Sequence, residues 1–144
     1  MIPFRIQLRP GVSISEQIIY AAKRAIVSGQ LQPGDPFPSV RTLSREAHIN
    51  PNTAARIIAA LLAEELLESH PGIGTVVAAL RDSTLRDRKD LLGRQVESLV
   101  VAAKGLAISR DDLLDSISDH WLRLSKDAPA TRPAKTNPKG DRSQ

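Results

Sequence analysis

The chain has 144 residues, enough for one compact domain and a small second unit, and its 41% hydrophobic content predicts a packed core rather than a disordered chain. With only 3% aromatic residues that core must be aliphatic, and without cysteine the chain cannot form disulfides or thiolate metal sites. The net charge of +4 suggests a nucleic-acid partner, but residues 1–80 are nearly neutral, with seven Lys/Arg against six Asp/Glu.

The first predicted helix starts after an irregular segment, residues 1–12, that contains Pro3, Pro10 and Gly11. Ser13 and Glu16 have the spacing of a capping box, in which a serine and a glutamate three residues later satisfy free backbone N–H groups. Gly29 follows the last periodic residue and is expected to end the helix. The apolar face between these signals is formed by Ile14, Ile18, Ala21, Ala22, Ala25 and Ile26.

A second and a third helix are predicted on either side of a short turn. Residues 31–38 contain three prolines and a glycine, which predicts a tight, pre-ordered connection. Ser39 is expected to cap a helix from Val40 to about Ala47, and residues 48–49 form the turn. The third helix opens with Asn50 as cap and Pro51 at the first helical position. Its buried stripe is predicted to be Ala54, Ile57, Ile58, Leu61, Leu62 and Leu66.

A two-stranded hairpin is predicted next, with residues 66–69 and 75–78 as strands around a glycine-rich tip at residues 70–74. The order helix, helix, turn, helix, hairpin is that of a winged helix-turn-helix, which we assign to residues 1–80. The fold class is therefore expected to be mainly α, with three helices and a two-stranded wing in this first domain.

Residues 81–125 are predicted to form a second, two-helix unit. Thr84 and Asp87 have capping-box spacing. Apolar residues then recur at intervals of seven, four, three and four residues before Gly105 and would form an apolar seam along the helix. That seam predicts a dimerisation surface made of Leu85, Leu92, Val96, Leu99 and Ala103. Ser109 and Asp112 are expected to cap a last helix that carries Leu113, Ile117, Trp121 and Leu124. Residues 126–144, with five Lys/Arg against two Asp/Glu and three prolines, are predicted to be a disordered basic tail.

Candidate DNA-binding residues cluster at the helix-turn-helix. Such a motif lays its second helix in the major groove and contacts bases from the N-terminal residues of that helix. Amide, hydroxyl and guanidinium side chains suit this role, because asparagine pairs with adenine through both amide groups, threonine bonds bases or phosphate, and arginine pairs with guanine. The candidates are Ser39, Arg41, Arg45, Asn50, Pro51, Asn52, Thr53, Arg56 and, at the tip of the hairpin, Gly72.

Several of these residues have a purely structural alternative. Asn50 is either a helix cap or a base contact, and Pro51 serves the helix start. Arg45 shares a helix face with Arg41 at i,i+4 spacing but is equally explained as a solvated surface charge. Gly72 suits any tight turn, and it also allows the backbone to approach a phosphate closely.

The stretch from Ser13 to Ala78 resembles the DNA-binding domain of GntR-family regulators, and the short C-terminal part resembles the YtrA-like subfamily. Five motif blocks in the same order carry the resemblance: Glu16-Gln17-Ile18, Gly29 to Asp35, Pro38 to Ser44, Asn50-Pro51-Asn52-Thr53 and Gly72 to Val77. The resemblance implies a homodimeric repressor that binds an operator of inverted repeats in double-stranded DNA. It also implies DNA contacts by Ser39, Arg41, Pro51, Asn52, Thr53, Arg56 and Gly72.

The wing departs from the family pattern. The family often carries basic residues where this chain has Glu68-Ser69-His70-Pro71, so we expect the wing to add little to phosphate binding. A different class of function therefore stays open, in which the winged helix is an adaptor for protein–protein contact without a specific DNA site.

An enzyme, a cofactor and a metal site are not expected. The three histidines are widely spread without ligand spacing, and there is no glycine-rich phosphate loop followed by lysine. The acidic residues of the last helix are attributed to the helix dipole and to solubility: Asp111, Asp112, Asp115 and Asp119.

No apolar run approaches 18 residues and no secretory signal is evident, so a cytoplasmic protein without a membrane partner is expected. A small-molecule effector is left open; its site would lie between protomers or around Leu80, because the helical pair leaves little room for a pocket of about 300 Å³.

Overall fold

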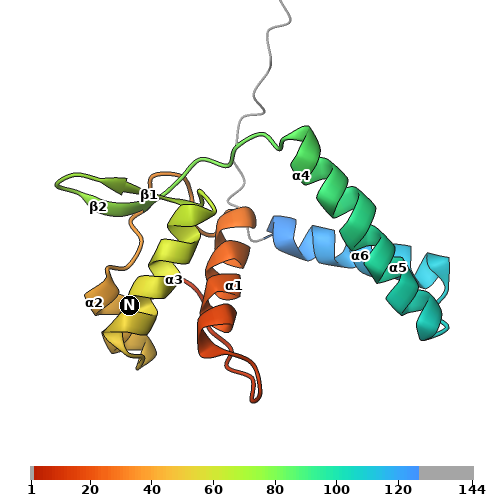
Figure 1. The fold of residues 1–144 in the computed structure, drawn as a ribbon, viewed down its shortest axis with the longest axis horizontal. Helices are drawn as coiled ribbons and strands as arrows, with labels where there is room; N and C mark the ends of the chain where they lie inside the picture. Colours follow the sequence, from red (N-terminus) through yellow and green to blue (C-terminus); the bar gives the residue numbers. More distant parts are fainter. Residues whose placement is uncertain (1, 127–144) are drawn as a thin grey trace, which may run out of the picture.

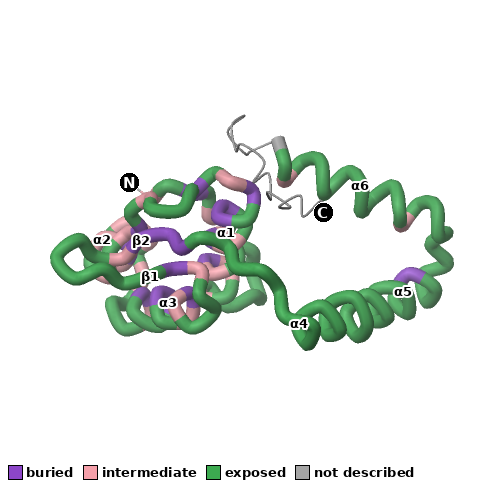
Figure 2. The backbone as a smooth tube through the Cα atoms, turned by 90° about the horizontal axis from the view of Figure 1, so that it is seen from above, coloured by how far each residue is buried: buried purple, intermediate pink, exposed green. Residues whose placement is uncertain are grey.

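The computed structural model describes residues 2–126, so the predicted tail at residues 126–144 lies outside the described part of the chain except for Lys126, which ends the last helix. The winged helix and the C-terminal helices occupy opposite ends of the molecule, joined by an extended segment that follows β2 (Figure 1). Figure 2 shows that nearly all buried residues belong to the winged-helix end, whereas the C-terminal helices are exposed over most of their length.

The winged-helix end has the predicted element order. It consists of helices α1 (Ile14–Val27), α2 (Val40–Ala47) and α3 (Pro51–Ala63), followed by strands β1 (Leu67–His70) and β2 (Gly74–Val77). The strands pair antiparallel, with Leu67 opposite Val77 and His70 opposite Gly74. The prediction had β1 starting one residue early, at Leu66, and β2 starting one residue late, at Thr75. His70 and Gly74 therefore end the strands rather than belonging to the tip.

Local hydrogen bonds explain why the helices begin and end where they do. The Ser13 hydroxyl accepts from the Glu16 N–H, which is the serine half of the predicted capping box. Gln17 adds an interaction that the spacing does not reveal: its side-chain amide donates to the carbonyls of Arg9 and Val12, which ties the preceding loop to α1. His48 ends α2 in the left-handed conformation, with φ of 54°.

The core of the winged helix is aliphatic, as the composition predicts, with two phenylalanines at its edge. Leu43, Ile57 and Leu61 are fully buried where α2 and α3 meet. The rings of Phe4 and Phe37 stack, with centroids 5.8 Å apart. Phe4 is buried although it lies in the irregular N-terminal segment, and Ile2 and Ile6 pack against the core beside it. The predicted stripe of α3 is confirmed in Ala54, Ile57, Ile58 and Leu61, while Leu62 is half-buried. Leu66, predicted to belong to the same stripe, lies beyond the helix end at Ala63 and is half-buried there.

The proline-rich connection pairs with the wing. Phe37 donates its N–H to the Thr75 carbonyl at 2.9 Å, and Gly34 donates to the Val77 carbonyl at 2.8 Å. The Val77 N–H in turn donates to the Asp35 carbonyl at 2.9 Å, so the free edge of β2 is paired with this segment. The connection therefore fixes the wing against the helices, in addition to joining α1 to α2.

The C-terminal unit contains one long helix with a π-helical segment, followed by α6 (Arg110–Lys126). The long helix runs through α4 (Leu85–Lys89), η1 (Asp90–Gln95) and α5 (Val96–Gly105). The predicted capping box at its start is present, since the Thr84 hydroxyl accepts from the Asp87 N–H and the Asp87 carboxylate accepts from the Thr84 N–H. The Ser109 hydroxyl likewise accepts from the Asp112 N–H before α6.

The π segment corrects one part of the predicted seam. A π turn bonds i to i+5 and so holds more residues per turn than an α turn. The interval of seven residues from Leu85 to Leu92 runs into this segment. The two side chains therefore do not share the helix face that regular α-helical spacing predicts. Ala103, the last predicted seam residue, is buried within its own chain, where its carbonyl accepts from the Ile108 N–H.

The two long helices of this unit meet at the turn after α5 and then diverge (Figures 1 and 2). They leave a row of large apolar side chains exposed that a packed helical pair would cover. On the long helix these are Leu91, Leu92, Val96, Leu99, Val100 and Val101, and on α6 they are Leu114, Ile117, Trp121 and Leu122. The unit thus has apolar surface that nothing in the described residues covers.

Candidate DNA-binding surface

The start of α2 is held by Ser39. Its hydroxyl accepts from the Thr42 N–H at 3.1 Å and also lies 3.1 Å from the Thr42 hydroxyl. This cap leaves the N–H groups of the first helical turn pointing out of the helix end, where anions are favoured. Ser39 and Arg41 are both exposed there. The serine therefore has a structural role, and the exposed helix end around it remains free to face a phosphate.

The start of α3 answers the question that the sequence left open for Asn50. The Asn50 side-chain oxygen accepts from the Asn52 N–H at 2.8 Å, and Pro51 occupies the first helical position. Asn50 is therefore a helix cap in this structure. Its oxygen is engaged in that cap, so any base contact by Asn50 would have to use the amide nitrogen.

The cap at Asn50 gives the first testable prediction. Asn50→Ala should lower the free energy of unfolding by about 1 kcal/mol, because the first turn of α3 loses its side-chain acceptor. Asn50→Ser should restore most of that stability, because serine also accepts at this position. Urea denaturation of both variants measures the difference. Equal destabilisation by alanine and serine would contradict the capping role.

Three arginines on the helix-turn-helix make no ion pair within residues 2–126: Arg41, Arg45 and Arg56. All three side chains are exposed. Two basic residues outside α2 and α3 are in ion pairs, Lys23 with Glu64 at 3.1 Å and Arg81 with Glu65 at 3.1 Å. The unpaired arginines are thus the cations that this unit offers to an anionic partner on α2 and α3.

The exposed side of α3 is small and polar. Asn52 and Arg56 lie one turn apart and are exposed, while Thr53 is half-buried beside them. Ala55 and Ala59 are also exposed on this helix and were not among the predicted site residues. Alanine gives no chemical signal in a sequence, but on this face it leaves room for the helix to approach a flat surface closely.

The wing offers no cation. Between residues 66 and 80 there is no lysine or arginine, and the one carboxylate, of Glu68, lies 3.1 Å from the His70 ring nitrogen. Gly72 is exposed at the tip with φ of 77°, a conformation that an L side chain rarely adopts. The wing therefore lacks basic residues, and its one carboxylate lies beside the His70 ring.

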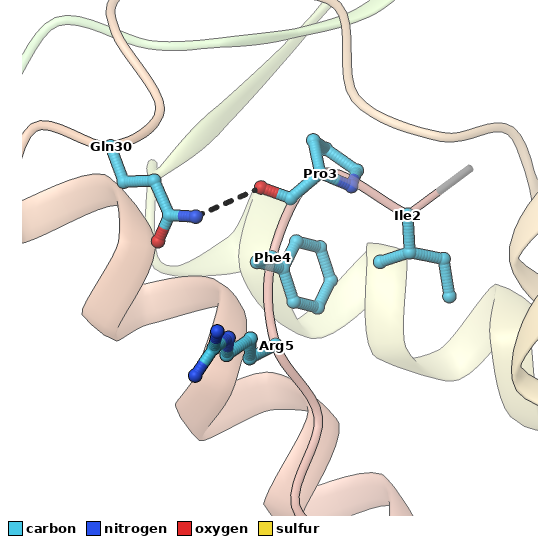
Figure 3. Close-up of a pocket in the computed structure, with 5 residues that line it drawn as sticks. All are labelled: Ile2, Pro3, Phe4, Arg5 and Gln30. Carbon is cyan, nitrogen blue, oxygen red and sulfur yellow. Dashed lines mark hydrogen bonds between the residues drawn. The ribbon is translucent and has the colours of Figure 1, made fainter.

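Other kinds of site receive no support from the described residues. Residues 2–126 contain no cluster of His, Asp or Glu that could hold a metal ion, the acidic residues of α6 included. None of the helices in this part is long and apolar enough to cross a membrane. A pocket of about 390 Å³ is lined by Ile2, Pro3, Phe4, Arg5 and Gln30 (Figure 3). Its polar interaction, from the Gln30 amide to the Pro3 carbonyl at 3.4 Å, is made within the chain, and nothing in it selects an effector.

The three helices, the wing and the exposed arginines on α2 and α3 define a DNA-binding winged helix-turn-helix protein. Comparison with known proteins agrees. The profile of the family described as "Bacterial regulatory proteins, gntR family" matches residues 14–77. The HTH-type transcriptional repressor YtrA of Bacillus subtilis (strain 168) is 30% identical over 116 residues, which cover 80% of this chain and 89% of that protein. This chain belongs to the GntR family of transcription regulators.

Further relatives extend the likeness over both units. The uncharacterized HTH-type transcriptional regulator YhcF of the same organism is 32% identical over 107 residues, covering 74% of this chain and 84% of that protein. A solved structure described as a transcriptional antiterminator from Listeria monocytogenes EGD-e has a TM-score of 0.72 at 23% identity and covers 85% of this chain and 92% of its own. A solved structure of a GntR-family regulator from Listeria monocytogenes has a TM-score of 0.59 at 22% identity and covers 78% of this chain and 98% of its own. The predicted family and its YtrA-like character are confirmed, as is the mainly helical winged fold.

Proposed function

We propose that this regulator is a homodimeric repressor that binds an inverted-repeat operator. In this proposal residues 1–80 are the DNA-binding domain and residues 81–125 the dimerisation domain. The repressor YtrA of Bacillus subtilis is 30% identical to this chain over 116 residues, and this similarity supports repression as the outcome of binding. A DNA-binding regulator must be in the same compartment as the DNA, and the proposed location is therefore the cytoplasm.

The observation that carries the dimer is the uncovered apolar surface of the C-terminal unit. Large apolar patches on a single chain mark interaction surfaces, because exposing them to water is unfavourable. Val96 and Leu99 recur at helical spacing on α5, with Leu92 exposed in the π segment before them, and Ile117 and Trp121 recur on α6. Trp121 is 74% exposed in the single chain, which is unusual for the largest apolar side chain unless a partner covers it. A second copy offers the same surface, so a two-fold pair can cover both.

Two-fold symmetry determines the form of the operator. A symmetric dimer presents two copies of α3 in opposite orientations, which requires inverted half-sites about one helical turn, or a multiple of it, apart. Dimerisation also adds specificity, because each base pair contributes only roughly 1–3 kcal/mol and one module contacts few bases.

The side chains divide into two groups in this proposal. Asn52, Thr53 and Arg56 read base edges in the major groove, because they lie at the start of α3 and carry donors and acceptors that bases can match. Arg41, Arg45 and the helix start at Ser39 contact phosphates, and the backbone at Gly72 approaches the duplex from the wing. Pro51 serves the helix start rather than a base.

The salt dependence of binding distinguishes this proposal from an adaptor role. A DNA-binding dimer should bind a pool of random-sequence duplexes, with an affinity that falls steeply between about 50 and 200 mM salt because bound counterions are released. Fluorescence anisotropy of the labelled pool measures this, and Arg41→Ala should weaken binding to every sequence and flatten the slope. Affinity that is independent of salt, or no binding at the lowest salt, would favour the adaptor.

A further inference from the structure

The long helix that begins the C-terminal unit changes its hydrogen-bond pattern between α4 and α5. In η1 the backbone bonds span five residues instead of four, and at its end the Val96 N–H donates to the Leu91 carbonyl. Regular α-helix lies on both sides of this segment. A π segment is rare in proteins and is found frequently at functional sites, so its presence in the helix that joins the two units calls for a cause.

One side-chain contact in this segment fits the π form and not the α form. The Gln95 side-chain amide donates to the Asp90 carboxylate at 3.3 Å, across five residues. Five residues of an α-helix rise about 7.5 Å and end on another side of the helix, which is too far for this hydrogen bond. Arg94 also donates to Asp90, at 3.5 Å, but its spacing of four residues fits an α-helix as well. The contact between Asp90 and Gln95 is therefore specific to the π form.

Gly93 lies inside the segment and makes the α form less favourable. Glycine is a poorer α-helix former than alanine, because it loses more conformational freedom when the helix forms. A Cβ added at Gly93 would meet no other part of the described chain within 4 Å, so packing does not require the glycine. Alanine would thus fit at this position and would favour the α form.

The form of the segment determines which way the apolar surface of α5 faces. A π turn holds one residue more than an α turn, so a change of form rotates α5 about the helix axis relative to α4. The connection from α4 to the winged helix is short and is held at its far end (Figure 1). There the Ala78 N–H donates to the Leu66 carbonyl at 3.0 Å, and Arg81 pairs with Glu65 at 3.1 Å. Residues 82–84 alone then lead to α4, so the winged helix follows a rotation of the long helix.

We propose that Asp90 and Gln95, by holding the π form, set the spacing between the two half-sites that the dimer accepts. The proposal rests on operator binding by a dimer, as proposed above. The apolar surface of α5 joins the two chains, and the π segment determines the angle at which each winged helix leaves that surface. Half-sites that face one side of the duplex lie about one helical turn or a multiple apart, so rotated winged helices require another spacing. Asp90 and Gln95 are in this way positioning residues that do not touch DNA.

Two variants separate the direction in which α5 faces from the π form itself. The double variant Gly93→Ala/Gln95→Ala removes the contact with Asp90 and favours the α form, so α5 is rotated. Its mass by light scattering should remain that of the dimer, its affinity for the operator selected by the native protein should fall about tenfold or more, and a new selection should enrich another spacing. Deletion of Gly93 is the matched control. It removes the extra residue of the π turn, so a regular helix keeps the native direction of α5 and should enrich the native spacing.

Engineered disulfides measure the form of the segment without DNA, since the chain contains no cysteine. Lys89→Cys with Arg94→Cys places two thiols five residues apart across the π segment. In an α-helix this spacing exceeds the Cα separation of about 7 Å that a disulfide tolerates. The disulfide should therefore form in the otherwise native chain and not in the double variant, as counted by free thiols and intact mass. Glu97→Cys with Ala102→Cys has the same spacing within α5 and should form no intrachain disulfide in either background.

The proposal is overturned if the double variant enriches the native spacing, or if the disulfide between positions 89 and 94 forms in it as readily as in the native chain. Loss of the dimer in the double variant would also contradict it, because a rotation of α5 leaves the apolar surface intact. An unaltered protein that enriches no repeat would instead contradict operator binding by a dimer. The disulfide result would still decide in that case whether Asp90 and Gln95 hold the π form.

Discussion

Leu99→Glu should convert the protein to a monomer and reduce operator affinity by about a thousandfold or more. Leu99 lies on the apolar face of α5 and is 44% exposed in the single chain, so a glutamate there is tolerated by the monomer and becomes buried only in the dimer. Burying a charge without a partner is strongly unfavourable. The monomer then binds one half-site alone, without the discrimination that the second set of base pairs contributes.

The mass of the protein in solution measures this effect, by light scattering alongside DNA binding. Leu92→Glu should behave in the same way, since Leu92 belongs to the same uncovered apolar surface and is 60% exposed. Ser98→Glu is the matched control, because Ser98 is an exposed polar residue of α5 beside Leu99 that does not belong to the apolar surface. A dimer mass that is unchanged by Leu99→Glu and Leu92→Glu would exclude this surface as the interface.

Asn52→Ala and Arg56→Ala should each weaken binding to the selected operator by roughly a hundredfold. A side chain that pairs with a base through two hydrogen bonds contributes about 1–3 kcal/mol of discrimination, and the dimer makes each such pair twice. Both side chains are exposed at the start of α3, so their removal should leave the fold intact. Each variant should also accept other bases at one position of each half-site.

Arg41→Ala provides the contrast for these two variants. It should weaken operator and random DNA by similar factors, and flatten the salt slope by about 0.9 for each phosphate that the protein no longer neutralises. Competition titrations with operator variants that differ at single base pairs separate the two behaviours. An unchanged base preference in Asn52→Ala and Arg56→Ala would remove both residues from the reading surface.

The helix-turn-helix could be predicted from the sequence almost to the residue. Its signals are local: Ser39 and Asn50 cap the helices that directly follow them, and Pro51 fits only the first turn. The exposed candidate residues on these helices were also foreseeable, because positions opposite the buried stripe must face solvent. The sequence could not decide whether Asn50 is a helix cap or a base contact, because both roles favour asparagine. The hydrogen bond from the Asn52 N–H to the Asn50 side chain showed the cap.

The features that the sequence did not predict depend on interactions between distant segments or on side chains without a polar group. Phe4 packs on Phe37, and the connection at residues 34–37 pairs with β2, in each case across more than 30 residues of sequence. The π segment leaves the apolar spacing of the helix looking regular, so the spacing from Leu85 predicted one continuous face. Ala55 and Ala59 carry no polar group that would have marked them as part of the exposed face of α3.

Selection of bound duplexes from a random DNA pool by the full-length protein tests the central claim most directly. The account predicts an enriched inverted repeat, with two identical half-sites whose centres lie about 10 base pairs, or a multiple of that, apart, bound by two chains. Selection repeated with Leu99→Glu should enrich no repeat. A single unrepeated half-site bound by one chain, or no enrichment at all, would contradict a dimer that reads DNA through the start of α3.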